Sequence, residues 1–210
     1  MSSEKEIWEF MSGESRPYRF EYVEGAEPLR ISVERKVIYV NKEVLISVIE
    51  DLVKAGLDWK EIMRKNLQHE KAHEQYFKWN LKWKVGAADY GWLPSFLTDI
   101  VIDKIQFAND AWYQKWLLAD AHHAFEITRR DIWHIVPRVS ARPHFLYTQA
   151  AYWVAMGAIT LDEAKDLYPE KADYIIEMSE LFNRIKSEED LEWAFPEAKG
   201  IYLKRFLLVK

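Results

Sequence analysis

The first forty residues alternate between hydrophobic and polar positions in a way that predicts strands. Alternation runs through residues 18–23 and 29–33, and residues 37–40 form a short β-branched and aromatic run. Gly25 and Pro28 separate the first two segments. A period of two is typical of a strand that buries one face. We therefore expect a small antiparallel sheet at the N-terminal end of the chain.

From Asn41 onward, hydrophobic residues recur with the spacing of amphipathic helices. Asn41 is a favourable N-cap for a first helix, which Gly56 ends. Asp58 and Glu61 have the spacing of a capping box that opens a long helix reaching about residue 84. Further helices are expected from an N-cap at Ser95, over residues 111–136 with a break, over 144–156, from a capping box at Thr160, and over 169–186 and 188–194.

These elements predict an α+β fold, with a small N-terminal antiparallel sheet followed by a mostly helical body. A long helix of that body carries the motif described below. No flexible linker interrupts the chain, so we expect a single compact domain over residues 1–210. Residues 1–110 would contain the sheet and the first long helices, and residues 111–210 would form the helical remainder.

The composition excludes several classes of protein. The chain has 210 residues, of which 49% are hydrophobic, and this is enough for a sizeable core. The mild net charge of −5, without a basic stripe, argues against a nucleic-acid partner. The polar N-terminus and the short apolar run at residues 150–159 argue against a leader peptide and a membrane span, so we expect a cytoplasmic protein. The sequence leaves the oligomeric state open.

One segment of the long helix has the pattern His69-Glu70-x-x-His73. Residues four apart lie on the same face of a helix, so the two imidazoles can bind one metal ion, for which zinc is the usual choice. Glu70 lies beside this face and can accept a proton from a metal-activated water. The chain has no cysteine, so other ligands must be carboxylates or histidines.

A third ligand is expected from Asp99 or Asp103, which are four residues apart on the next helix. The extended motif in which a third histidine follows on the same segment is excluded, because Tyr76 and Trp79 stand at its glycine and histidine positions. One aspartate can bind the metal while the other accepts the spare N–H of a ligand histidine. The spacing alone leaves open which of the two takes which role.

With these residues the chain resembles the zincin metallopeptidases, and within them the gluzincins, over about residues 29–109. That resemblance implies a zinc cofactor, a peptide or protein substrate, and Glu70 as the general base of hydrolysis. It also implies a ligand on the helix after the motif helix, with an aspartate four residues further on, so that Asp99 is the candidate ligand and Asp103 the candidate outer partner. The chain departs from the gluzincin pattern because Asp99 stands where that family has glutamate.

Two other functions are compatible with the same residues. Glu70-x-x-His73 is half of the motif of carboxylate-bridged di-iron or di-manganese bundles. The other half would be Asp120-x-x-His123 or Asp131-x-x-His134, although a sheet argues against a bundle. A zincin-like fold could also bind metal for regulation without turnover. Arg138, Arg142, His144 and Tyr147 are further candidates for stabilising an oxyanion, on residue type alone.

Overall fold

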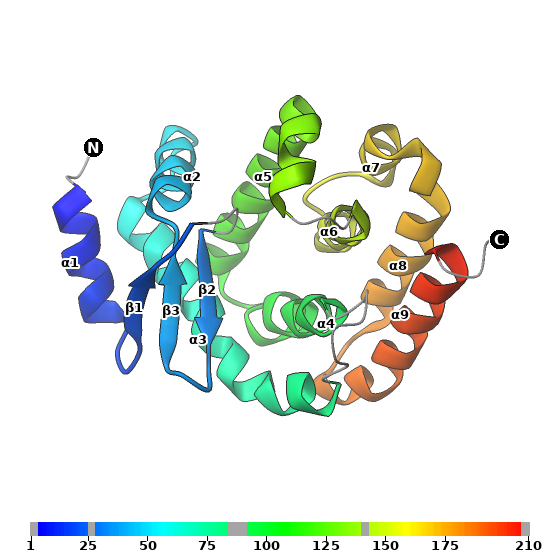
Figure 1. Ribbon diagram of the computed structural model, residues 1–210, viewed down its shortest axis with the longest axis horizontal. Helices are drawn as coiled ribbons and strands as arrows, with labels where there is room; N and C mark the ends of the chain where they lie inside the picture. The colour runs from blue at the N-terminus through cyan, green and yellow to red at the C-terminus, as the bar shows by residue number, and fades with distance from the viewer. Residues whose placement is uncertain (1–3, 25–27, 84–91, 140–142, 207–210) are drawn as a thin grey trace.

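The protein has an α+β fold in which a three-stranded sheet lies at one end of a helical body (Figure 1). The structure is a computed structural model that describes residues 4–24, 28–83, 92–139 and 143–206. Within these ranges it does not describe the side chains of residues 4, 80, 131–139 and 143. The predicted fold class is therefore confirmed.

The sheet contains β1 (Arg19–Tyr22), β2 (Leu29–Ser32) and β3 (Val37–Val40) in the order β1-β3-β2. β2 pairs antiparallel with β3, but β1 pairs parallel with it, so the expectation of an all-antiparallel sheet is wrong. β3 is the most apolar strand and buries three of its four residues, whereas β1 is mostly exposed. The apolar strand therefore takes the centre, and β1 and β2 become the edges.

The helix α1 (Glu4–Glu14) precedes the sheet and was not expected from the sequence, which predicted only strands here. Ile7 and Met11 lie one helical turn apart and are buried in the same hydrophobic cluster as the sheet. Trp8 and Phe10 also pack against this cluster, so the helix has an apolar face whose period the sequence analysis did not use.

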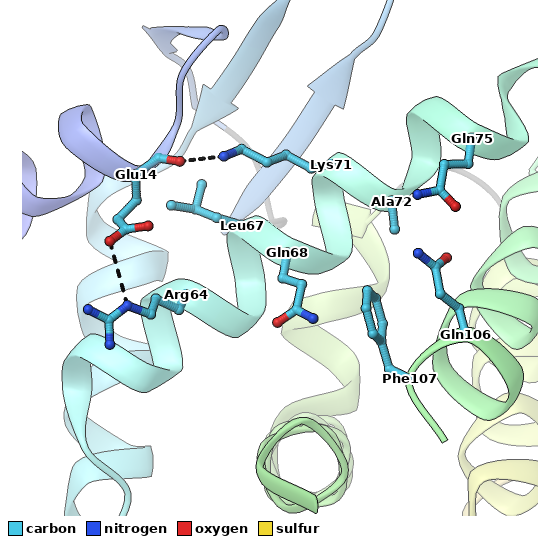
Figure 2. A pocket seen from close by; sticks show the side chains of 9 residues that line it. All are labelled: Glu14, Arg64, Leu67, Gln68, Lys71, Ala72, Gln75, Gln106 and Phe107. Atoms are coloured by element: carbon cyan, nitrogen blue, oxygen red, sulfur yellow. Dashed lines mark hydrogen bonds and ion pairs between the residues drawn. The ribbon is translucent and has the colours of Figure 1, made fainter. Parts of the chain in front are cut away.

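Polar contacts from the end of α1 attach it to the motif helix. Glu14 forms an ion pair with Arg64, at 3.6 Å, and its carbonyl accepts a hydrogen bond from Lys71 (Figure 2). These residues border a pocket of about 390 Å³ on the face of the helix that carries Gln68 and Gln75. Helical spacing places this face opposite His69 and His73, so the pocket is separate from the candidate site.

Two capped helices follow the sheet as predicted. In α2 (Lys42–Lys54) the N-cap Asn41 accepts a hydrogen bond from the backbone of Val44. In α3 (Trp59–Lys82) the N-cap Asp58 accepts from the backbone N–H groups of the first turn, at 3.0 and 3.1 Å. Gly56 adopts the positive φ of 87° that lets the chain leave α2.

The next helix, α4 (Leu93–Val101), begins earlier than predicted. Ser95 lies inside it rather than at its N-cap, because Pro94 occupies the first turn, where a missing N–H has no helical partner to lose. A π-helical turn, η1 (Ile102–Gln106), continues the chain, with Phe107 N–H bonded to the carbonyl of Ile102 at 3.0 Å. Such turns re-aim side chains and occur often at functional sites.

The remaining chain is helical. The backbone of α5 is continuous, contrary to the expected break, and the last helix continues through Pro196 well beyond residue 194. The predicted capping box at Thr160 is confirmed. The elements are α5 (Ala111–Val139), α6 (Pro143–Met156), α7 (Leu161–Leu167), η2 (Pro169–Lys171), α8 (Ala172–Arg184), η3 (Glu188–Asp190) and α9 (Leu191–Phe206).

The buried side chains form two hydrophobic clusters, and α3 contributes to both. Its first half, including Ile62 and Leu67, packs with the sheet, α1, α2 and the start of α5. Its second half, including Tyr76 and Trp79, packs with α4, α6, α8 and α9. Figure 1 shows α3 running from the sheet toward the C-terminal helices. Within the described residues, no helix combines the length and apolar character that crossing a bilayer requires.

Candidate metal centre

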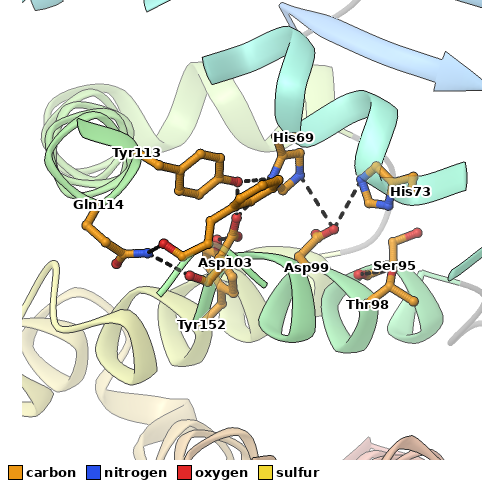
Figure 3. Close-up of polar contacts among 10 residues, drawn as sticks. His69, His73, Ser95, Thr98, Asp99, Asp103, Tyr113, Gln114 and Tyr152 are labelled. Carbon is orange, nitrogen blue, oxygen red and sulfur yellow. Dashed lines mark hydrogen bonds and ion pairs between the residues drawn. The ribbon is translucent and has the colours of Figure 1, made fainter. Parts of the chain in front are cut away.

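His69, His73 and Asp99 converge where α3 passes α4 (Figure 3). The Nε2 atoms of His69 and His73 lie 3.7 and 3.4 Å from the same oxygen, Oδ1 of Asp99. Two ligands about 2.0–2.2 Å from a tetrahedral ion are about 3.4 Å apart, so these separations match the edges of a zinc site. The three side chains are only 15–22% exposed. Two imidazoles and a carboxylate form a donor set suited to zinc.

The outer partner of His69 is Asp103, which is completely buried. Its Oδ1 lies 2.9 Å from His69 Nδ1, the nitrogen on the far side of the ring from Asp99. The Nδ1–H donates to this carboxylate, so Nε2 is the nitrogen that faces Asp99 and that carries the free lone pair when His69 is neutral. Asp103 therefore determines both the tautomer and the orientation of His69.

Two tyrosine hydroxyls donate hydrogen bonds to the buried carboxylate of Asp103. Tyr113, from α5, donates to Oδ1 and also lies 2.8 Å from His69 Nδ1. Tyr152, from α6, donates to Oδ2. Burial and the nearby Asp103 charge raise the pKa of both phenols, so they remain protonated donors at neutral pH. Both oxygens of Asp103 thus have hydrogen-bond partners, which offset the cost of burying this carboxyl group in the core.

The two histidines have opposite electrostatic surroundings. Burial alone would lower the pKa of His69, but the adjacent Asp103 carboxylate outweighs it and raises this pKa to about 10. Burial lowers the pKa of His73 to about 3, and the neighbouring charge of His69 acts in the same direction. Without a metal, His69 therefore carries the proton of the pair and His73 is a neutral base at pH 7.

Glu70 lines the same cleft as His69, His73 and Asp99. This cleft has a volume of about 500 Å³ and lies between the α3–α4 face and the sheet, where β2 forms its wall. Glu70 is not one of the three residues whose ligand atoms converge, although it lines the same cleft.

The remaining candidate residues do not join this trio, although Asp120 lies close enough to interact with it. Burial raises the pKa of Asp120 to about 6, the charge of His69 lowers it, and the charge of Asp103 raises it. Among the residues that the structure describes, only His69, His73 and Asp99 form a cluster of three metal-binding groups, and neither Asp120 nor His123 belongs to it. His123 instead faces Asp51 of α2, at 3.7 Å. The side chains of Asp131, His134, Arg138 and Arg142 lie outside the described part of the chain. His144 contacts Tyr202, and Tyr147 packs beside Tyr168, in an aromatic group of the C-terminal helices.

The sequence analysis missed the two tyrosines that contact Asp103. Tyr113 and Tyr152 lie 10 and 49 residues beyond it and come from different helices. A tyrosine among many in an apolar stretch carries no mark of a polar partner, so no pattern in the sequence indicates them. Comparisons with protein-family models, curated proteins and solved structures gave no match for the chain.

Proposed function

We propose that the protein is a zinc-dependent peptidase that uses Glu70 as its general base. The observation that carries this proposal is the convergence of His69 and His73 on one oxygen of Asp99, at the spacing of a tetrahedral ion. The contact of Asp103 with His69 supplies the outer support that ligand histidines use. The zincin resemblance of the sequence agrees with both.

Each residue has a distinct role in this proposal. The zinc ligands would be His69, His73 and Asp99. When bound, zinc lowers the pKa of a water molecule and polarises the carbonyl group of the substrate. Glu70 would accept the proton of the attacking water and deliver it to the leaving amine. Asp103, held by Tyr113 and Tyr152, would keep the Nε2 lone pair of His69 free for the metal.

The strand that lines the cleft favours an extended peptide as substrate. The hydrogen bond from Asn41 N–H to the carbonyl of Pro28, at 3.1 Å, fixes which residues of β2 face β3. The direction of the backbone polar groups alternates along a strand. The N–H and C=O groups of Leu29 and Ile31 therefore point to the open edge of β2, away from β3. Within the described residues no further strand pairs with this edge, so its polar groups can pair with a substrate strand.

The decisive experiment compares Glu70→Gln with the parent protein. The amide keeps the size of the side chain but cannot accept the proton, so zinc content should stay at one per chain while hydrolysis of casein or a fluorogenic peptide is lost. Glu74→Gln is the matched control, because Glu74 lies on the same helix and bonds to Lys36 and Tyr18 outside the cleft. It should cleave like the parent.

Metal analysis of the same samples separates the other functions. Two iron or manganese ions per chain would support the di-metal alternative. One zinc without chelator-sensitive cleavage would support a regulatory metal site. Equal cleavage by Glu70→Gln and the parent would rule out Glu70 as the base.

A further inference from the structure

The cleft of the candidate site has a basic rim on the side of the sheet. Arg30 in β2 and Arg35 in the turn after β2 line it together with Tyr39 and one acidic residue, Glu34, and both arginines are exposed. His69 and His73 line the same cleft from α3. A substrate bound at the histidines would therefore pass beside these guanidiniums.

Neither guanidinium forms an ion pair with a carboxylate in the part of the chain that the structure describes. Each instead contacts Tyr39. A guanidinium presents its N–H donors in a planar fork that matches a carboxylate. Arg30 and Arg35 can thus offer donors to an anion from outside the chain. Other arginines are already paired, namely Arg19, Arg64, Arg129, Arg130, Arg184 and Arg205.

Tyr39 holds the two guanidiniums close together. Arg30 and Tyr39 are direct cross-strand neighbours, and the guanidinium carbon lies 5.0 Å from the ring centroid. Arg35 donates a hydrogen bond from Nη1 to the Tyr39 hydroxyl, at 3.3 Å. Both side chains are therefore partly ordered before a ligand arrives, which lowers the entropy cost of binding.

The geometry of β2 determines which part of a substrate they would meet. Leu29 and Ile31 pack toward the core, so Arg30 lies on the outer face of the sheet. A peptide that pairs with the open edge of β2 places every second side chain on this same face. Those side chains would lie next to Arg30 and Arg35.

We propose that Arg30 and Arg35 bind a carboxylate of the substrate peptide and so give the cleft a preference for acidic peptides. This inference rests on the proposed peptidase function, because it assumes a peptide along β2. The carboxylate can belong to an Asp or Glu side chain or to the C-terminus of the peptide, and the experiment below separates these sources.

The test uses the full-length zinc-loaded protein and a set of fluorogenic peptides. In one arm the C-terminus is amidated and a single Glu replaces Gln at successive positions. In the other arm the peptide has no acidic side chain and a free C-terminus. The variants are Arg30→Glu and Arg35→Glu. Arg19→Glu is the matched control, because Arg19 is an exposed arginine of the same sheet that does not line the cleft.

We expect at least one carboxylate-containing peptide to be cleaved with a kcat/KM about tenfold above its neutral counterpart, the scale of one charge-assisted hydrogen bond. Arg30→Glu and Arg35→Glu should abolish or reverse this preference, and Arg19→Glu should keep it. Cleavage without a preference, or equal effects of the three variants, would overturn the inference while leaving the peptidase proposal in place.

Binding of the same labelled peptides to the zinc-loaded Glu70→Gln variant separates the two proposals further. Carboxylate-dependent binding by this variant, together with no cleavage by the parent, would retain the basic rim and reject the peptidase. Neither binding nor cleavage of any peptide would reject both.

Discussion

The two aspartates of the candidate site are four residues apart but have different surroundings. Asp99 is 22% exposed and faces the Nε2 atoms of both histidines. Asp103 is completely buried and contacts only the far nitrogen of one of them. Their roles in metal binding should therefore differ in kind, one as a ligand and the other as a support.

We predict that Asp99→Ala releases zinc, whereas Asp103→Asn retains it with an affinity roughly 10–100-fold lower. The first change removes a ligand, and the second weakens only the acceptor for His69 Nδ1–H. Chelator competition measures both affinities. Asp162→Ala, at an 89% exposed position, should bind zinc like the parent. Weaker binding by Asp103→Asn than by Asp99→Ala would reverse the assignment.

From the shifted pKa values of the two histidines, we predict that the metal-free protein is most stable near pH 6.5, the ordinary pKa of histidine. The pKa of His73 is lowered to about 3, so its contribution is present above pH 6.5 and is lost as the pH falls toward 3. The pKa of His69 is raised to about 10, so its contribution is present below pH 6.5 and is lost as the pH rises toward 10. On each side of the maximum, the free energy of unfolding falls by up to about 1.4 kcal/mol per pH unit.

The curve of stability against pH thus has an acid limb and an alkaline limb, one on each side of the maximum. Urea unfolding of chelator-treated protein across this pH range measures both. Asp103→Asn removes the charge that raises the pKa of His69, so it should flatten the alkaline limb. An unchanged alkaline limb in that variant would mean that Asp103 does not control His69.

Among the elements, α3 contributes both to the candidate site and to the hydrophobic core. It presents the histidines between two hydrophobic clusters, and its first turn depends on the N-cap Asp58. Its start lies three turns before the metal site, so the cap supports the stability of the helix and not the geometry of the ligands.

We predict that Asp58→Ala lowers the free energy of unfolding by about 1 kcal/mol, because two backbone N–H groups lose their acceptor. Zinc stoichiometry and affinity should be unchanged. Asp58→Ser is the control, since serine also caps helices and should recover most of the stability. Loss of zinc from a folded Asp58→Ala protein would show that the cap does act on the site.

Across the whole molecule, the C-terminal helices complete the site that the N-terminal half begins. Tyr152 of α6 reaches the buried Asp103, and α3 and α4 pack in the same cluster as α6. The helix α6 is thus connected to the candidate site through a side-chain hydrogen bond as well as through packing.

We predict that Tyr152→Phe and Tyr174→Phe both destabilise the fold by about 1–3 kcal/mol, since each removes a hydrogen bond to a buried polar group. Only Tyr152→Phe should also weaken zinc binding, by about tenfold, because Tyr174 bonds to Thr148 and not to Asp103. Denaturant unfolding and chelator competition give the two numbers. Equal zinc affinities in the two variants would limit Tyr152 to a structural role.

Features that depend on neighbours along the chain could be predicted from the amino-acid sequence. The caps Asn41, Asp58 and Thr160 form local hydrogen bonds, and the apolar periods of the strands and of α3 reflect their own geometry. The placement of His69 above His73 follows from the same helical period. These interactions span a few residues, so a pattern in the sequence records them directly.

Contacts between separate elements could not be predicted in this way. The central position of β3 follows from competition among strands for burial, which no single strand encodes. The contact of Tyr152 with Asp103 joins residues 49 apart, and the approach of Asp99 to both histidines depends on how α4 packs against α3. Such contacts arise from the packing of the whole core, whereas local preferences of each segment are compatible with several arrangements.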